Sequence, residues 1–418
     1  MPRLANRIPC LLLSFLLIIT GCGRDNLKME ERMDEIDLFH FENSQSATER
    51  LNQFMYGQSI AERSEQAERF KIVHISDAHL AFWAQGTYWS APVNLVNAVS
   101  FANQPELRIN AIVSTGDNIG NERNHYPEKF MSNFFFNLYA NNYIPTVHCF
   151  GNHDNNMLDG GTRNLLTHDQ LYDSYTNKIN VEINSPGRTN YYYTDLPSPD
   201  GGYFRLIALD PLDQPVIKYD ALHYAYFSQQ QIEWLTKTAL RGMTDKHSVV
   251  LLTHFPFQRY RNDKSTYMID GDHVHPWSMV PEIIEAFRSK KSLTAIYPNQ
   301  FDSNDLIHVD VDFSDSPGEF VCHLGGHLHT FTHFELKGLS NANEQLPPQK
   351  MIISSTLDPY ASSNLYHSMT REFQTLSSNS FNIYAVDTSE KAIYVTYFGS
   401  RPTAFFPPNA DVIRIPYL

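Results

Sequence analysis

Short apolar runs that end in polar clusters recur along the chain and predict buried β-strands. Six such runs lie at residues 70–76, 109–114, 145–150, 203–209, 248–253 and 319–324. Helical sequence separates the first three runs, around 92–103 and 128–140. This alternating order predicts parallel strands that are joined by crossover helices.

Two further elements have clear local signals. Residues 228–240 predict a helix, with Ser228 as its N-cap, Gln231 at the capping-box position and Gly242 just beyond its end. Near the C-terminus, the runs 381–386 and 392–397 flank a short polar turn and predict a β-hairpin.

The composition and periodicity of the chain also predict how it divides into segments and domains. Residues 259–318 have mixed composition and no clean period, so we interpret them as an insertion rather than a separate domain. The expected segments are a lipoprotein signal peptide at 1–21, a polar stalk at 22–68, one domain at 69–400 and a C-terminal tail at 401–418.

The N-terminus has the pattern of an export signal. Arg3 and Arg7 precede an apolar run at 8–19, which is too short to favour a membrane-spanning helix. The run ends in Ile-Thr-Gly-Cys at Cys22, which resembles the bacterial lipobox, whose cysteine is lipidated. The alternative is an ordinary signal peptide with an incidental cysteine. We expect an exported lipoprotein that is anchored to the membrane through Cys22, in a bacterial cell envelope.

Composition and charge narrow the class of protein. The chain has 418 residues, 42% hydrophobic and 13% aromatic, so it can bury a sizeable core and disorder is disfavoured. Its net charge of -14 repels nucleic acid unless a local patch or bound metal reverses the field. No stretch interleaves basic and aromatic residues, so there is no signal for nucleic-acid binding.

Two cysteines lie outside the signal region, Cys149 and Cys322. Both lie in apolar runs, which favours buried free thiols over a disulfide. Neither has the spacing of a zinc-thiolate site.

Candidate chemistry gathers where the predicted strands end. Ligands of open α/β sheets bind beyond the carboxyl ends of the strands, so residues at these ends should converge. The polar clusters at five strand ends are Asp77-Ala78-His79, Gly116-Asp117-Asn118, Gly151-Asn152-His153-Asp154, His254, and Gly326-His327-Leu328-His329.

The residue types in these clusters favour metal binding. Carboxylate, imidazole and amide oxygen together suit Mn, Fe or Zn. Two carboxylates and at least four histidines exceed the needs of one ion. A bridging carboxylate can hold two ions about 3.5–4 Å apart, which is the spacing of two-metal hydrolases.

Taken together and in this order, the clusters resemble the signature of the calcineurin-like metallophosphoesterase superfamily: Asp-x-His, Gly-Asp, Gly-Asn-His-Asp or Glu, a later His, and Gly-His-x-His. The resemblance covers about residues 70–399. It implies a four-layer α/β/β/α sandwich of two mixed β-sheets flanked by helices. It also implies a hydrolase of phosphate esters that depends on two divalent metal ions.

The resemblance further implies roles for single residues. The implied ligands are Asp77, His79 and His329 for one ion, Asn152, His254 and His327 for the other, and Asp117 as the bridge. His153 is then a general acid or a donor to the developing charge, and Asp154 orients its ring. The attacking group would be a hydroxide that bridges the metals, in line with the leaving group.

One departure narrows the subgroup. Purple acid phosphatases, which are relatives of this family, lack the first histidine and place a tyrosine three residues after the aspartate of Gly-Asp. Here His79 is present and position 120 is Gly120, so the purple subgroup is disfavoured.

Several neighbouring residues have two interpretations. Residues 270–277 form either a substrate-facing loop or a solvated turn that covers the core. Asparagines that follow the ligand clusters could contact phosphate or simply form turns: Asn118, Asn121, Asn155 and Asn156. His323, His333 and the aromatic run 191–193 are interpreted as structural.

Three functions compete at this stage. The leading one is an exported phosphoesterase, with phosphodiesters slightly favoured over phosphomonoesters because of the large insertion and the missing purple-type signature. The second is a non-catalytic surface lipoprotein that binds a phosphorylated ligand through the same metals. The third is a structural lipoprotein without metal.

Overall fold

The structure is a computed structural model. It describes residues 59, 68–79, 90–119, 142–156, 165–214, 224–257, 260–261, 268–269, 278–299, 302–329, 331–336, 349–354, 357, 371, 376–400 and 412–418. The expected signal peptide, most of the stalk, the expected helix at 128–140, Gly120 and the loop at 270–277 lie outside these residues. Within the described part, no helix has the length and apolar character needed to cross a membrane.

The first six-stranded sheet combines three parallel and three antiparallel strands. Its order is β16-β15-β14-β1-β2-β3. The strands are β1 (Phe70–Ile75), β2 (Ala111–Thr115), β3 (Thr146–Cys149), β14 (Ser380–Asp387), β15 (Ala392–Gly399) and β16 (Ile413–Pro416). β1, β2 and β3 pair in parallel, as the alternating sequence pattern predicts. β14 and β15 form the predicted hairpin.

The second six-stranded sheet has the order β12-β13-β11-β6-β5-β4 and is also mixed. Its strands are β4 (Tyr192–Pro197), β5 (Tyr203–Ala208), β6 (His247–Leu252), β11 (Glu319–Gly325), β12 (Thr332–Leu336) and β13 (Gln349–Ile353). Its four central strands are parallel, whereas the edge strands β4 and β12 are antiparallel to their neighbours. The two mixed sheets confirm the expected fold class.

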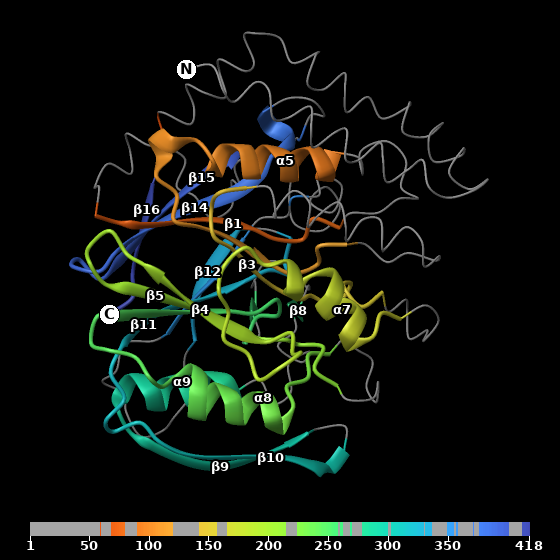
Figure 1. Cartoon of the computed structure of the whole chain (residues 1–418), viewed down its shortest axis with the longest axis vertical. Coiled ribbons are helices and arrows are strands. Elements are labelled where there is room, and N and C mark those ends of the chain that lie inside the picture. The colour runs from red at the N-terminus through yellow and green to blue at the C-terminus, as the bar shows by residue number, and fades with distance from the viewer. Residues whose placement is uncertain are drawn as a thin grey trace.

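Helices lie on the outer faces of the two sheets (Figure 1). The helices are α5 (Ser90–Ala102), α7 (His168–Ser174), α8 (Gln229–Trp234) and α9 (Met279–Ser289), with 3₁₀ turns at Pro105–Leu107, Thr176–Lys178 and Leu376–Ser378. α5 covers the first sheet, and α8 and α9 cover the second. α8 continues as a π-helical turn at Leu235–Ala239, which together with it occupies most of the predicted helix.

Three apolar clusters of described residues separate these layers. The core between the sheets includes Phe70, stacked on Phe204 with ring centroids 4.1 Å apart. It also contains the free thiols of Cys149 and Cys322, which are buried and unpaired as the sequence indicates. Burial of this apolar surface is the dominant favourable term that holds the two sheets together.

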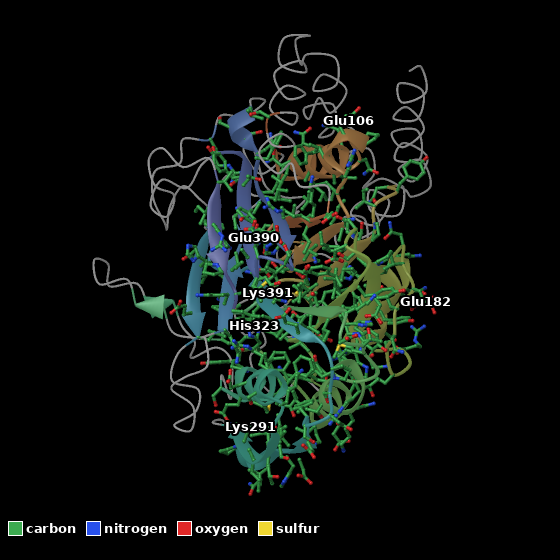
Figure 2. All side chains as sticks on the ribbon, turned by 90° about the vertical axis from the view of Figure 1, so that its left-hand side faces the viewer. Glu106, Glu182, Lys291, His323, Glu390 and Lys391 are labelled. Atoms are coloured by element: carbon green, nitrogen blue, oxygen red, sulfur yellow. The ribbon has the colours of Figure 1, made fainter. Side chains whose placement is uncertain are left out.

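The insertion contributes an extra outer layer. β9 (Ser292–Asn299) and β10 (Asp302–Asp312) form an antiparallel ribbon, which packs beyond α8 and α9 (Figure 1). The short strands β7 (Tyr260–Arg261) and β8 (Met268–Ile269) pair with each other. In the rotated view, Glu106, which follows α5, and Lys291, which precedes β9, lie toward opposite sides of the described part of the molecule (Figure 2). The described insertion is therefore continuous with the core on the second sheet.

The expected boundary at residue 400 needs correction. β16 lies in the segment that the sequence predicts as a tail, yet it pairs with β15 and closes the edge of the first sheet. Ile415 and Tyr417 are buried in the core between the sheets. Alternating apolar residues at 413, 415 and 417 explain this placement, because such a pattern buries one face of a strand.

Candidate metal centre

Five strand ends converge on one region between the sheets. Asp77 and His79 follow β1, and their backbone N–H groups donate to the carbonyls of Gly116 and Asp117 at 3.0 and 2.9 Å. On the second sheet, Gly326 N–H donates to the carbonyl of His254 at 3.0 Å. These bonds fix the loops against one another before any side chain is considered.

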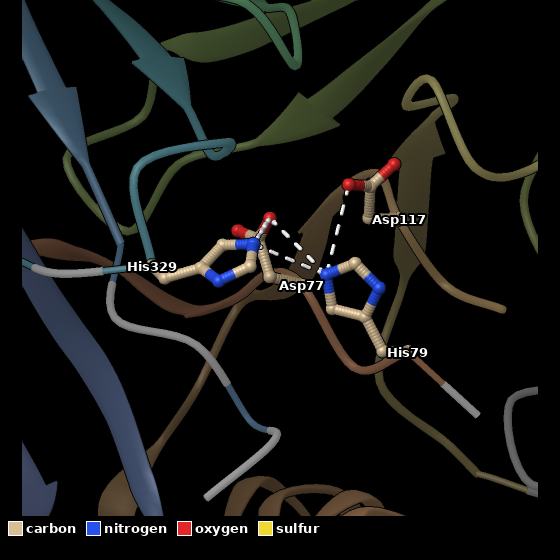
Figure 3. Close-up of side chains that lie close together, drawn as sticks. All are labelled: Asp77, His79, Asp117 and His329. Atoms are coloured by element: carbon tan, nitrogen blue, oxygen red, sulfur yellow. Dashed lines mark hydrogen bonds and ion pairs between the residues drawn. The ribbon is translucent and has the colours of Figure 1, made fainter. Parts of the chain in front are cut away.

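The first group of side chains consists of Asp77, His79, Asp117 and His329 (Figure 3). His79 Nε2 lies 3.1 Å from His329 Nε2 and 3.7 Å from Asp117 Oδ2. His329 Nε2 lies 3.3 Å from Asp77 Oδ1. Figure 3 shows the two imidazoles and two carboxylates pointing toward one common space.

The second group shares one residue with the first. It contains Asp117, His254 and His327. His254 Nε2 lies 3.1 Å from Asp117 Oδ2 and 3.0 Å from Asn152 Oδ1, and His327 Nδ1 lies 3.2 Å from the same amide oxygen. Asn152 therefore belongs to this group, and Asp117 lies between the two groups.

The donor chemistry of the second group fits a cation. His254 Nδ1 lies 2.7 Å from the carbonyl oxygen of Thr115, which can only accept, so this nitrogen carries a proton. Nε2 of the neutral ring then points its lone pair at Asp117 Oδ2. Two lone pairs at this distance need a positive charge between them. Burial lowers the pKa of His254, but Asp117 outweighs it and raises the value to about 9. A metal ion would take the place of that proton.

Asp77, His79 and His327 are held in the forms that bind metal. Burial raises the pKa of Asp77, but His329 outweighs it and brings the value to about 2. Burial lowers the pKa of His79 to about 3 and that of His327 well below its usual range. These three residues thus present one ionised carboxylate and two neutral imidazoles, which are the protonation states that ligation requires.

Backbone strain is concentrated at the same residues. Five of the seven candidate ligands have left-handed backbone, with φ of 44 to 71°: Asp77, His79, Asp117, His327 and His329. Each such residue costs roughly 1–2 kcal/mol relative to right-handed backbone. Strain of this kind persists where the surrounding structure enforces it, and it clusters at functional sites.

Glycines permit the close approach of the loops. A Cβ on Gly326 would lie 2.0 Å from Ser76 Oγ and 2.8 Å from Asp77 Oδ2. A Cβ on Gly151 would lie 2.2 Å from Asp117 Oδ1. Only glycine fits here, because any side chain would displace a candidate ligand.

His153 lies beside the centre but belongs to neither group. Its Nε2 is 3.9 Å from Asp117 Oδ2, its backbone N–H donates to Asp117 Oδ1 at 2.9 Å, and its side chain is 26% exposed. Burial lowers the pKa of its imidazole, against the opposing charge of Asp117. The ring is therefore a neutral, partly accessible group at the edge of the centre.

Asp154 does not orient His153 as the sequence-based interpretation expects. Its carboxylate accepts from the backbone N–H groups of Gly151, Asn118 and Ile119 at 2.8–3.1 Å, and from Asn118 Nδ2 at 3.2 Å. Within the described residues, His153 Nδ1 has no hydrogen-bond partner. The carboxylate turns toward the loop after β2 because that loop supplies the unpaired backbone donors. Burial and Asp117 raise the pKa of Asp154 to about 7.

The structure shows the roles of some of the neighbouring residues for which the sequence allows two interpretations. Asn118 is buried, and its amide oxygen accepts from Ser114 Oγ at 2.7 Å while its Nδ2 donates to Asp154. Its side chain therefore stabilises the loop after β2. Asn155 and Asn156 are buried as well, and Asn121 lies outside the described residues. His323 Nε2 lies 2.7 Å from Gln349 Oε1 in the second-sheet core, as its structural interpretation predicts.

Sequence reasoning missed two kinds of residue. One is the carbonyl of Thr115, because backbone acceptors leave no signal in residue identity. The other is Asp210, which follows β5 just as the recognised clusters follow their strands. Its position after a predicted strand could have marked it.

A match to the sequence profile of one protein family shows the family to which the chain belongs. The profile of the calcineurin-like phosphoesterases matches residues 70–331, which is more than half of the chain. The chain belongs to the calcineurin-like phosphoesterase family.

Comparisons beyond the family profile are more distant. The solved structure of PhoD is 12% identical over 82% of this chain and 73% of its own, with a TM-score of 0.43. The protein TT1561 of Thermus thermophilus is 10% identical over 69% of this chain and 91% of its own, with a TM-score of 0.33. Comparison with curated proteins gives no significant match. For this calcineurin-like phosphoesterase, the site's own geometry carries the functional argument.

Proposed function

We propose that this chain hydrolyses phosphate esters at a two-metal centre, with phosphodiesters preferred over phosphomonoesters. The observation that carries the proposal is the sharing of Asp117 by two groups of candidate ligands. A single carboxylate between two sets of imidazoles is the arrangement that lets two cations sit close together. Membership of the calcineurin-like phosphoesterase family supports the same chemistry.

The residues divide into two sets around Asp117. Asp77, His79 and His329 would hold one ion, and Asn152, His254 and His327 the other. When bound, such ions polarise phosphoryl oxygens and generate a nucleophile from water at neutral pH. Imidazole, carboxylate and amide ligands suit Mn, Fe or Zn.

The protein's own contribution is positioning and charge. His153 lies at the accessible edge of the centre, where its neutral ring can donate a hydrogen bond to a phosphate oxygen as negative charge develops there. Asp154 acts on it indirectly, by holding the loops after β2 and β3 together. We therefore assign His153 as the catalytic residue and Asp154 as a positioning residue.

A paired comparison of two variants tests the assignment. His153→Ala should keep both metals and lose roughly 10²–10³-fold in turnover, because removing one donor to a developing negative charge costs that much. Asp117→Asn should lose metal as well as activity, since it removes the shared charge. His308→Ala, an exposed position on β10, is the matched control. A wild-type rate for His153→Ala would refute its role.

A second candidate function uses the same residues without turnover: a surface lipoprotein that holds a phosphorylated ligand through its metals. The partly exposed His153 ring favours hydrolysis over this alternative. Metal-loaded protein that binds inorganic phosphate, yet releases no product from a broad panel of phosphate esters, would favour binding alone.

The preference for diesters rests on the large insertion between β6 and β11. The assay compares mono- and bis-p-nitrophenyl phosphate side by side in added Mn²⁺. Faster turnover of the monoester would reverse the preference without affecting the metal centre.

Export and anchoring through Cys22 complete the proposal. The lipobox-like end of the apolar N-terminal run supports it. Cys22→Ser should abolish labelling by a fatty-acid analogue and release the protein from the membrane fraction of a bacterial host. Unchanged membrane association would argue for a different anchor.

A further inference from the structure

A third group of metal-binding side chains lies apart from the seven candidate ligands. His168 is the first residue of α7, and Asp210 and Asp213 lie in the turn after β5. Donor atoms of the three side chains lie within 4.8 Å of one another. The hydrogen bonds around them show what the group can bind.

His168 has the tautomer that metal binding needs. Its Nε2 lies 3.0 Å from the carbonyl oxygen of Gln214, which can only accept, so Nε2 carries the proton. In the neutral form of the ring, Nδ1 then has a free lone pair, and this atom lies 3.7 Å from Asp210 Oδ2. A histidine that donates its other N–H to a backbone carbonyl is the usual outer arrangement of a metal ligand.

Asp210 supplies an independent indication of a missing cation. The residue is fully buried, and its Oδ1 accepts from the N–H of Leu212 at 2.9 Å. Among the described residues, none reaches its Oδ2 with hydrogen-bond geometry. Burial raises the pKa of the carboxyl, although the Asn190 side chain is close enough to oppose that rise. A buried acceptor without a partner costs about 1–3 kcal/mol. The 3.7 Å to His168 Nδ1 is too long for a direct hydrogen bond. By contrast, two donors bound at about 2.1 Å to one tetrahedral ion lie roughly 3.4 Å apart.

Surrounding residues hold the two carboxylates in place. Gln231 accepts from the N–H of Asp210 at 2.8 Å, and its Nε2 donates to Asp210 O and Asp213 Oδ2, both at 3.0 Å. Ser228, the N-cap of α8, donates to Asp213 through its backbone N–H and its hydroxyl. Of the predicted capping box, only the bond from the Gln231 N–H to Ser228 Oγ forms. The Gln231 side chain binds the two aspartates instead.

A fourth side chain lies near the two aspartates. Among the described residues, the buried hydroxyl of Tyr191 has no hydrogen-bond partner, and burial together with Asp213 and Asp210 raises its pKa. The carboxyls of Asp210 and Asp213, together with the imidazole of His168, make an environment that a cation would satisfy.

We propose that His168, Asp210 and Asp213 bind one divalent transition-metal ion of the Zn²⁺ type, at a site separate from the two-metal centre. One imidazole with two carboxylates favours such an ion over Ca²⁺, which prefers oxygen ligands alone. Since the His168 side chain is 38% exposed, an ion can reach the buried carboxylate from solvent.

The ion would connect α7 to the end of β5 and, through them, to the catalytic loop. Leu166, two residues before His168, donates its N–H to the carbonyl of Asn155 at 2.9 Å. Asn155 in turn lies two residues after His153. The site is therefore structural, and its occupancy should stiffen the loop that carries His153.

Zinc stoichiometry in a suitable background tests the proposal. The full chain with Asp77→Asn and Asp117→Asn, which disables the two-metal centre, is titrated with Zn²⁺ by calorimetry. We expect one equivalent to bind and to raise the melting temperature. Adding Asp210→Asn should abolish both effects, because the amide keeps the acceptor for Leu212 and can donate to His168 while losing the charge. His168→Gln should act alike, and His308→Gln should change nothing.

Two outcomes would overturn the proposal. One is a background protein that binds no Zn²⁺, or binds it equally well with Asp210→Asn. The other is that the NMR signals of the His168 ring respond to pH but not to added Zn²⁺. In that case a proton, rather than a metal ion, lies between His168 and Asp210. Neither readout involves hydrolysis, so the result is independent of the proposed enzyme activity.

Discussion

Adding one methyl group at Gly116 should disable the metal centre without touching a ligand. A Cβ on this residue would lie 2.4 Å from Gly151 N and 2.7 Å from the carbonyl carbon of Phe150. Both atoms belong to the backbone, so no side-chain rotation can relieve the contact. Ordinary contact starts at 3.4 Å, and the loops after β2 and β3 must therefore separate by about 1 Å (3.4 − 2.4).

The cost has two parts. Gly116 has φ of +94°, so alanine pays roughly 1–2 kcal/mol for left-handed backbone. Overpacking adds about 1–3 kcal/mol, which gives a loss of about 2–5 kcal/mol in the free energy of unfolding. A 1 Å displacement of Asp117, the next residue, should lower kcat/KM about 100-fold.

The matched control is Gly201→Ala. Gly201 also has a positive φ, +83°, but no atom lies within 4 Å of its Cβ position. It should therefore show the conformational cost alone and keep full activity. The measurements are thermal unfolding, metal content, and hydrolysis of bis-p-nitrophenyl phosphate for each variant. Equal rates and metal contents in the two variants would refute the claim that this contact positions Asp117.

Three further predictions concern acid, loop bracing and metal. Burial lowers the pKa of His323 to about 3, so only the unfolded chain takes up its proton between pH 6.5 and 3, and stability falls with pH by about 1.4 kcal/mol per unit. Measured by urea unfolding, the free energy of unfolding of His323→Gln should rise by about 2 kcal/mol relative to that of the wild type as the pH falls from 6.5 to 5. The control His308→Gln should show no such relative change. An equal difference between His323→Gln and the wild type at both pH values would contradict the burial of a neutral His323. Asp154→Asn replaces one accepting oxygen with an NH₂ group that faces the N–H donors of the loops. It should lower the free energy of unfolding by about 2–3 kcal/mol, measured with a chemical denaturant. An unchanged free energy of unfolding would exclude the role of Asp154 in holding the loops together. Chelation should abolish hydrolysis and lower the melting temperature, with Mn²⁺ restoring both; activity that survives complete metal removal would exclude the proposed centre.

Much of the fold is predictable because buried parallel strands leave continuous apolar runs. All six predicted strands exist, and β1, β2 and β3 pair in parallel. β9 and β10 escaped prediction because they form a two-stranded ribbon in which residues such as Thr294 and Asp310 face solvent. Such strands alternate polar and apolar residues, and their signal is weak where the partner strand is also unknown.

The candidate ligands were predictable for a different reason. Each follows a strand, and the carboxyl ends of strands mark the binding edge of a sheet. The partner of Asp154 was not predictable, since its direction depends on a loop 36 residues away in the chain. The same holds for His168 and Asp210, whose proximity depends on how α7 packs against β5.

The long chain separation between ligands links metal binding to folding. The backbone N–H of His327 donates to the carboxylate of Asp77, which lies 250 residues earlier and on the other sheet. A fragment that carries one sheet alone would lack part of each candidate ligand set, so uptake of metal would report that the two sheets have docked. A ligand that binds only the docked state stabilises it in proportion to the logarithm of its concentration. The metal supply of the surrounding compartment would then set how long a newly made chain stays open to proteases.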